Sequence, residues 1–420
     1  MVEEKISKTL EFCKGLSNHE SVLLHEFPEE VALAKLAIAE MEFPTTRKEE
    51  WKYTRTARIT SEVWHIVKNT AAIDIEPFLI PGLDASVIVF VNGFYDAALS
   101  KIKAEDGIVL SELCLEEFEV ESNSENVFDA IHTAYCTGVL SIDVSKNIQA
   151  QQSLHILHIS ATEKSMAQPL VQIQLEKSSE LHVVESFVST SNHKSFSNRH
   201  LQVFVESNAS LVMDKIQSET DENFLMNEER VHIEGNGRFT INTLTIDGGW
   251  VRNNLHIELE GENIETNLHG LYLPRNKQHI DNHTKVNHRF PHCNSNELYK
   301  GMLNDQSTGV FNGKVFVQPD AQKTNAFQSN ANILLSDDAQ MNSKPELEIY
   351  ADDVKCSHGS TTGQLDENAL FYLKSRGLGE ESAKKLLTTA FLNDVLDKVE
   401  NAFVRKYVTE ELIKRDLLLQ

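Results

Sequence analysis

A polar corner motif recurs along the middle of this chain, and it constrains the fold more than any other feature. Each copy begins with an aliphatic residue and a glutamate, and it then runs through mostly small or polar residues to the next apolar residue. The copies occupy residues 175–181, 205–211, 233–239 and, more loosely, 259–264, so they begin 30, 28 and 26 residues apart. A repeat of this length, built only of strands and turns, is typical of a solenoid.

Short apolar or alternating runs lie between the corners. They include LHILHI at 154–159, LVQIQL at 170–175, LQVFV at 201–205 and FTINTLTI at 239–246. These runs predict a mainly β core in which inward aliphatic side chains stack from one turn to the next. A β-sandwich is the alternative, but it requires hairpin turns and no repeated corner. Two later corner-like stretches, 318–322 and 336–340, lie closer together, so we expect the coil to change there.

The sequence pattern divides the chain into three regions. Residues 1–150 read as a mixed, partly helical domain, residues 151–360 as the β-solenoid core, and residues 361–420 as a helical domain. In the last region a 3.6-residue period follows Asp366, and Gly377 stands where a helix end favours a positive φ angle. A helical cluster of this size buries little by itself, so we expect it to dock on the solenoid, on a partner, or on both.

The first region begins with a helical pattern over residues 3–16, and Pro28 opens a second predicted helix. We expect this second helix to bury an apolar face that includes Leu33, Leu36 and Ile38. Trp51, further along, is expected to pack against the neighbouring helices rather than to bind a ligand.

Composition excludes several classes of function. The chain has 39 basic and 63 acidic residues, a net charge of −24, which argues against nucleic acid or an anionic membrane as its main partner. Its start is acidic, and no apolar run is long enough to span a bilayer. Five scattered cysteines without a CxxC pair favour a reducing, cytoplasmic setting. The chain lacks GxxxxGK[ST], GxGxxG and GxSxG, so we do not expect it to hydrolyse ATP by itself.

Cys356 and His358 are the first candidate ligands. They stand two residues apart in a predicted strand, so both side chains point to one face. A thiolate and an imidazole are metal ligands of different softness, and they could bind one ion together. The alternative is a buried cysteine beside a histidine that is bonded to a backbone carbonyl.

A second group of candidates is dense in histidine. It comprises His279, His283, His288, His292 and Cys293. Zinc binding is one interpretation, although the spacing matches no common zinc module and Pro291 interrupts the strand. The other interpretation is a set of polar, solvent-facing histidines along the edge of the solenoid.

Four longer motifs together resemble one family. They are FPTTRKEEWKYT at 43–54, HTKVNHRFPHCNSNELYKGML at 283–303, FNGKVFVQPDAQKTNAFQSN at 311–330, and the stretch from LEIYADDVKCSHG to FYLKSRG at 347–377. They resemble the SufB/SufD family of scaffold subunits in the SUF system of iron–sulfur cluster assembly, and within it the SufD subfamily. A SufB chain would carry a cysteine in the strand near residues 327–330 and an acid-His-acid motif around residue 358, and both are missing.

The resemblance implies a right-handed parallel β-helix with helical domains at both ends. It implies a scaffold without catalytic activity that pairs with SufB through the β-helix and with the ATPase SufC, usually present in two copies. SufC would dock on the C-terminal helices, over about residues 366–396. The residues expected to carry this docking are Asp366, Phe371, Tyr372, Arg376 and Phe391.

The resemblance also implies where a cluster is built. In the family a nascent cluster forms at the SufB–SufD interface, and the histidine of the CSHG motif, here His358, is implicated as a ligand or as the point of iron entry. Cys356 would lie at the same interface, either as a ligand or as a packed thiol. The resemblance leaves open a homodimer of the isolated chain, a flavin in the complex and the identity of the recipient proteins.

Overall fold

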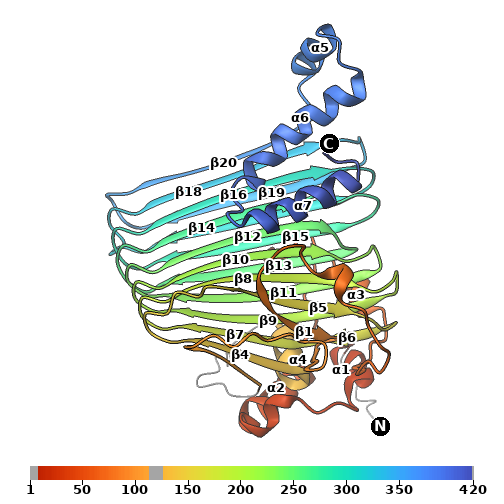
Figure 1. Ribbon diagram of the computed structural model, residues 1–420, viewed down its shortest axis with the longest axis vertical. Coiled ribbons are helices and arrows are strands. Elements are labelled where there is room, and N and C mark those ends of the chain that lie inside the picture. Colours follow the sequence, from red (N-terminus) through yellow and green to blue (C-terminus); the bar gives the residue numbers. More distant parts are fainter. Residues whose placement is uncertain (1–7, 113–125, 419–420) are drawn as a thin grey trace.

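The computed structural model describes residues 8–112 and 126–418, and it is a parallel β-solenoid of about eight turns with helices at both ends (Figure 1). The expected mainly β class and the flanking helices are therefore confirmed. The twenty strands are β1 (Ala85–Val91), β2 (Phe94–Tyr95), β3 (Ile108–Ser111), β4 (Gly138–Val144), β5 (Ser153–Ser160), β6 (Ser165–Ala167), β7 (Pro169–Leu175), β8 (Glu180–Ser189), β9 (Ser195–Val205), β10 (Ser210–Ser218), β11 (Asn223–Ile233), β12 (Arg238–Asp247), β13 (Trp250–Leu259), β14 (Glu265–Tyr272), β15 (His279–His288), β16 (Asn294–Leu303), β17 (Thr308–Val317), β18 (Asn325–Leu334), β19 (Gln340–Ile349) and β20 (Lys355–Gly363).

Helices occur at the two ends of the described chain. The α-helices are α1 (Lys8–Cys13), α2 (Pro28–Glu40), α3 (Ala57–Thr60), α4 (Val127–Tyr135), α5 (Glu367–Ser375), α6 (Glu380–Leu396) and α7 (Ala402–Lys414), and the 3₁₀ turns are η1 (Lys14–Leu16), η2 (Val22–His25), η3 (Glu49–Trp51) and η4 (Glu76–Phe78). Residues 1–7, the start of the first predicted helix, lie outside the described residues. None of the described helices is long and apolar enough to cross a membrane.

The strands form two facing sheets. One sheet runs in the order β2-β1-β5-β8-β10-β12-β14-β16-β18-β20, and the other in the order β19-β17-β15-β13-β11-β9-β7-β4-β3, with β6 beside β9. From β7 onward, each strand lies in the opposite sheet from the strand that follows it in sequence. Each strand pairs in parallel with the strand one full turn away. This arrangement excludes the β-sandwich alternative, which would pair consecutive strands through hairpins.

The repeated corner links a strand of the second sheet to the next strand of the first. One residue in each copy has a positive φ angle, for example Ser178, Asn208 and Asn236, and its backbone N–H donates to a carbonyl of the next turn. The recurring glutamate also has a structural role. Glu176, Glu206 and Glu234 each accept from a backbone N–H of the preceding corner, so the motif holds successive turns in register.

The expectation that the coil changes near residues 318–340 is wrong. Residues 318–322 continue the same row of corners, and Lys323 has the positive φ angle there. Residues 336–340, in contrast, belong to the corner at the opposite end of the turn, between β18 and β19. The two stretches are close in sequence because they are the two ends of one turn.

Replacing Asn208 by valine is expected to lower the free energy of unfolding by about 1–2 kcal/mol, because a β-branched residue is strained at positive φ. Asn208 has φ +63° in the second copy of the corner. The matched control is Asn208→Gly, which adopts this conformation readily and should change stability by only a few tenths of a kcal/mol. Thermal unfolding measures both, and a valine variant as stable as the glycine variant would count against the role of the corner.

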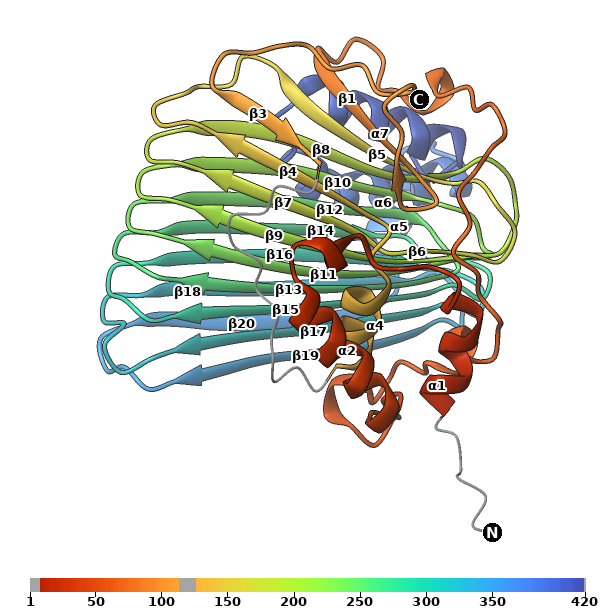
Figure 2. The same ribbon diagram turned by 90° about the horizontal axis from the view of Figure 1, so that it is seen from below.

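Two sets of helices cover opposite outer faces of the solenoid (Figure 2). Helices α1, α2 and α4 lie on the sheet that contains β9, β11 and β13. Trp51 stacks on Phe128 of α4 with ring centroids 5.7 Å apart, so its expected packing role is confirmed. Helices α6 and α7 cover the other sheet. The expected buried face of α2 is wrong in part. Ile38 is buried, but Leu33 and Leu36 are 60% and 67% exposed, because Val31, Ala34 and Ile38 form the face that packs.

The interior of the solenoid holds charges as well as aliphatic side chains. The side chains of Glu185, Arg199, Lys215 and Glu229 are fully buried and form an ionic cluster. Arg199 Nη1 and Lys215 Nζ lie 2.8 and 2.7 Å from the Glu229 carboxylate, and Arg199 also pairs with Glu185. Burial opposes the ionisation of Glu229, but Lys215 and Arg199 hold its pKa below the usual value. Two cations therefore balance two carboxylates.

Candidate functional site at the open end of the solenoid

The last turn of the solenoid leaves one end open. Among the described residues, β19 and β20 are the final strands of their sheets, and each pairs through its sheet with only one neighbour (Figure 1). All side chains of β20 except Cys356 are exposed, although those of the equivalent inward positions on β18 are buried. Pro345 stands within β19, as is common for a strand at the edge of a sheet. The open end thus exposes the solenoid interior and two strand edges that no described strand covers.

Cys356 and His358 lie on this open end. They pair in register with Ala326 and Gln328 of β18, whose side chains are buried inside the solenoid. Both therefore point to the inward side, as their spacing predicts. Cys356 is half-buried against a small apolar cluster, and burial raises the pKa of its thiol, whereas His358 is exposed.

Two polar residues lie directly behind His358. Glu297, Gln328 and His358 occupy the same inward position on three successive turns. Gln328 Nε2 donates to Glu297 Oε2 over 2.6 Å, while Gln328 Oε1 is buried without a hydrogen-bond partner. Burial raises the pKa of Glu297 to about 7. The free carbonyl oxygen of Gln328 is suited to accept an N–H from His358 and fix the orientation of its ring.

Our sequence interpretation missed Glu297 and Gln328. Gln328 precedes His358 by 30 residues, and Glu297 precedes Gln328 by 31, each about one turn of the solenoid. The solenoid period itself was therefore the signal that could have identified them.

The floor beneath the open end is also polar. Asn330 Nδ2 donates to Tyr272 Oη over 2.9 Å, and Ser343 Oγ donates to Asn330 Oδ1 over 2.8 Å. Ser360 of β20 donates to Ser343 of β19 over 2.7 Å, so it connects the two sheets across the last turn. This network attaches β20, the strand that carries Cys356 and His358, to β19.

The second group of candidate ligands does not come together. Thr54 lies 2.9 Å from His279 Nε2, and His283 Nε2 lies 2.9 Å from Asp281 Oδ1. His288 is buried and bonded to Ser295, and Cys293 is buried. Only His292, at a corner with φ +63°, is exposed as the solvent-facing interpretation predicts.

Over the described ranges 8–112 and 126–418, no group of three or more His, Cys, Asp or Glu side chains is placed to hold a metal ion. The pair Cys356 and His358 could supply at most two ligands. A protein-bound iron–sulfur cluster commonly has four, so a second chain would have to supply the others.

The C-terminal helices differ in how firmly they are held. No residue of α5 is buried, and Phe371 and Tyr372 are 74% and 56% exposed. Arg376 lies over the Tyr372 ring at 5.1 Å from its centroid, and Asp366 caps α5 by accepting from two backbone N–H groups. Phe391 of α6 instead contacts Lys300 of the solenoid, at 4.3 Å from the ring centroid. Helix α5 therefore projects beyond the open end with an apolar face uncovered (Figure 1).

The fold, the open end and the projecting helix define a class of protein, a parallel β-solenoid with an uncovered last turn and helices at both ends. The chain belongs to the SufBD family, because residues 158–391, more than half its length, match the domain described as "SUF system FeS cluster assembly, SufBD core domain". It is 27% identical to the iron–sulfur cluster assembly protein SufD of Escherichia coli (strain K12) over 376 residues, 89% of each chain. A SufBD family protein of Synechocystis sp. is 27% identical over 386 residues, 86% of this chain and 85% of that one. The chloroplastic protein ABCI7 of Arabidopsis thaliana is 29% identical over 300 residues, 69% of this chain and 63% of that one.

Proposed function

We propose that this chain is the SufD-type scaffold subunit of a SUF complex. Its open end pairs with the β-solenoid of a SufB-type subunit, and an iron–sulfur cluster or its iron is held transiently between them as cargo. The observation that carries this proposal is the inward-facing pair Cys356 and His358 on an uncapped solenoid end. A solenoid generally needs a capping element to cover its last turn, and a second solenoid of the same family would supply one.

His358 is the principal ligand or point of iron entry in this proposal. It is exposed, and a neutral imidazole binds iron more weakly than a thiolate, which suits a cluster that must be released. Cys356 is partly packed and its raised thiol pKa opposes the thiolate form, so it would bind only if the incoming metal displaces its proton to solvent. Gln328 would act as a positioning residue by accepting an N–H of His358.

The SufC-type ATPase would dock on α5. The docking face consists of Phe371 and Tyr372 with Arg376 beside them. Asp366 would contribute by capping α5, and Phe391 by its contact with Lys300, which holds α6 on the solenoid. ATP hydrolysis would belong to that partner, and this chain would have no catalytic activity of its own. A cytoplasmic location follows from the same proposal.

Phe371→Asp is expected to reduce the amount of SufC-type partner retained by the tagged chain at least tenfold, the effect of losing a central apolar contact. The SufB-type partner should still be retained, because α5 lies outside the solenoid end. Co-purification of the three proteins from cells that express all of them measures both.

The matched control is Leu33→Asp, which changes another exposed apolar residue, on α2 at the other end of the molecule. It should retain both partners. Failure of the wild-type chain to retain either partner would refute the proposed complex, and full retention of the ATPase by Phe371→Asp would refute the docking face.

A further inference from the structure

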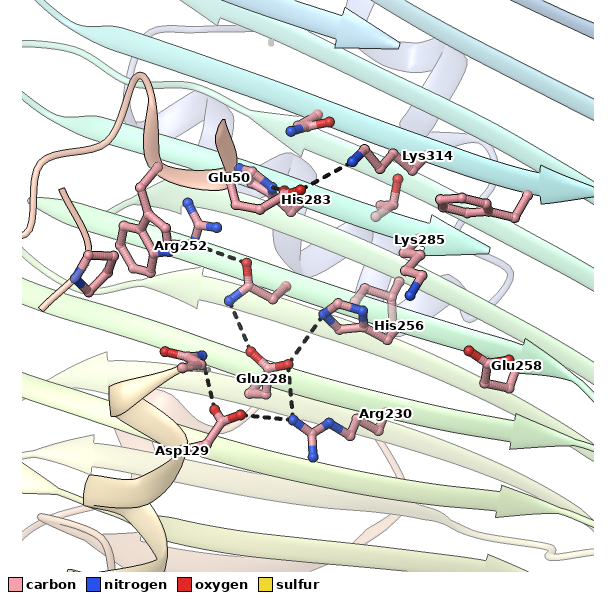
Figure 3. Close-up of a pocket in the computed structure, with 18 of the residues that line it drawn as sticks. Glu50, Asp129, Glu228, Arg230, Arg252, His256, Glu258, His283, Lys285 and Lys314 are labelled. Atoms are coloured by element: carbon pink, nitrogen blue, oxygen red, sulfur yellow. Dashed lines mark hydrogen bonds and ion pairs between the residues drawn. The ribbon is translucent and has the colours of Figure 1, made fainter. Parts of the chain in front are cut away.

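A groove of about 600 Å³ lies on the outer face of the solenoid (Figure 3). Its floor is the outer face of β11, β13, β15 and β17, and its walls include Pro44, Trp51 and the start of α4. Pockets of this size are typical of small-molecule sites. Neither the proposed scaffold function nor the cysteine–histidine pair uses this groove.

Four basic side chains cross the floor in one row. They lie in register on the neighbouring strands β11, β13, β15 and β17 of one sheet, and they are Arg230, His256, Lys285 and Lys314 (Figure 3). Neighbouring strands lie about 4.8 Å apart, so side chains of like charge stand next to one another. Such neighbours repel each other, and a row of this kind needs compensation by negative charge.

The two ends of this basic row are compensated by the protein. Arg230 lies 2.9 Å from Asp129 of α4, and Lys314 lies 3.1 Å from Glu50 of η3 and 3.3 Å from Glu346. These ion pairs attach the N-terminal elements to the solenoid. Arg230 and Lys314, the two end residues of the row, therefore have a structural role.

The two basic side chains in the middle of the row have fewer carboxylate partners than the two at its ends. His256 has one carboxylate partner, Glu228 at 3.3 Å, and its side chain is 41% exposed. Lys285 makes no ion pair with any described residue, and its ammonium group instead lies 5.6 Å from the ring centroid of Phe316. Lys285 is thus a cation flanked by His256 and Lys314, in a groove open to solvent.

We infer that this groove binds a small, multiply charged oxyanion across His256 and Lys285. A lysine ammonium is a compact charge that binds phosphate and carboxylate groups, and the row could bind two such groups side by side. The half-buried ring of Phe316, which lines the groove, would contact an organic part of the ligand. Glu228 and Glu258 line the groove beside the row, so they would repel an anion that does not lie on the basic side chains.

The test is calorimetric titration of the full chain at low ionic strength with inorganic diphosphate and, separately, with citrate. Both probes carry adjacent negative groups, and their comparison distinguishes a phosphate ligand from a carboxylate ligand. We expect saturable binding of at least one probe and weaker binding of monophosphate. Lys285→Gln should weaken it about tenfold or more, the effect of losing one charge-assisted hydrogen bond.

Lys177→Gln is the matched control, because Lys177 is an exposed lysine at a solenoid corner outside the groove. It should bind as the wild type does. The inference is overturned if neither probe saturates, if Lys285→Gln binds as tightly as the wild type, or if both lysine variants weaken binding equally. The circular dichroism spectra of both variants should match the wild type, because both lysines are on the surface.

Discussion

His358→Ala is expected to lower the iron and acid-labile sulfide of the purified three-protein complex about tenfold or more, while the complex itself still assembles. We expect a loss of this size because the variant removes an iron ligand. Even the loss of a residue that only orients a ligand typically lowers metal affinity 10- to 100-fold. Assembly should persist because the exposed side chain of His358 supports no other part of the fold. Anaerobic purification followed by iron and sulfide assays measures the effect.

Two further variants make this result specific. His25→Ala removes an exposed histidine at the opposite end of the chain, in η2, and should leave the cluster content unchanged. Cys356→Ser separates the two roles of that residue. A loss of iron comparable to that of His358→Ala would make Cys356 a ligand, whereas lower thermal stability with normal iron would make it a packed thiol. Unchanged iron in His358→Ala would leave this chain as a purely structural partner of the SufB-type subunit.

Glu229→Gln is expected to destabilise the fold by about 3–5 kcal/mol, because it leaves Lys215 and Arg199 buried with one carboxylate instead of two. All four members of the ionic cluster are buried inside the solenoid, so water cannot solvate the excess charge. The urea concentration at the midpoint of unfolding measures the loss. Glu76→Gln breaks an exposed ion pair with Lys101 and should cost less than about 1 kcal/mol.

A double variant tests the cause. Lys215→Met together with Glu229→Gln removes one charge of each sign and leaves Arg199 paired with Glu185. If charge imbalance is the reason for the loss, this double variant should be more stable than Glu229→Gln alone. A double variant that is less stable by the sum of the two single effects would show that packing, and not charge, determines the stability of the cluster.

The solenoid could be predicted because its corners repeat a physical requirement. Each corner needs a residue that tolerates positive φ, and three of them also carry a glutamate that bonds to the preceding corner, so both features recur in the sequence at about the length of one turn. The shared face of Cys356 and His358 followed from the alternation of a strand. The helix end at Gly377, with φ +93°, followed from the preference of glycine for that conformation.

Other features depend on contacts between distant segments, which no local pattern reveals. His279 lies against Thr54 because the N-terminal segment folds back onto β15, 225 residues further along the chain. Arg199 and Lys215 resemble surface residues within alternating strands, and only their partners on neighbouring turns make their burial possible. Likewise, the helical period after Asp366 predicts where the solenoid ends, but no local pattern says that its last turn is left uncovered.

The most direct test of the central claim is pulsed electron paramagnetic resonance on the reduced, cluster-loaded complex, with ¹⁵N-histidine in this chain only. Binding of the cluster by His358 is expected to give a ¹⁵N hyperfine coupling that the unlabelled complex lacks and that His358→Ala removes. A paramagnetic cluster without ¹⁵N coupling, or with coupling that survives in His358→Ala, would contradict a cluster held at the open end by this residue.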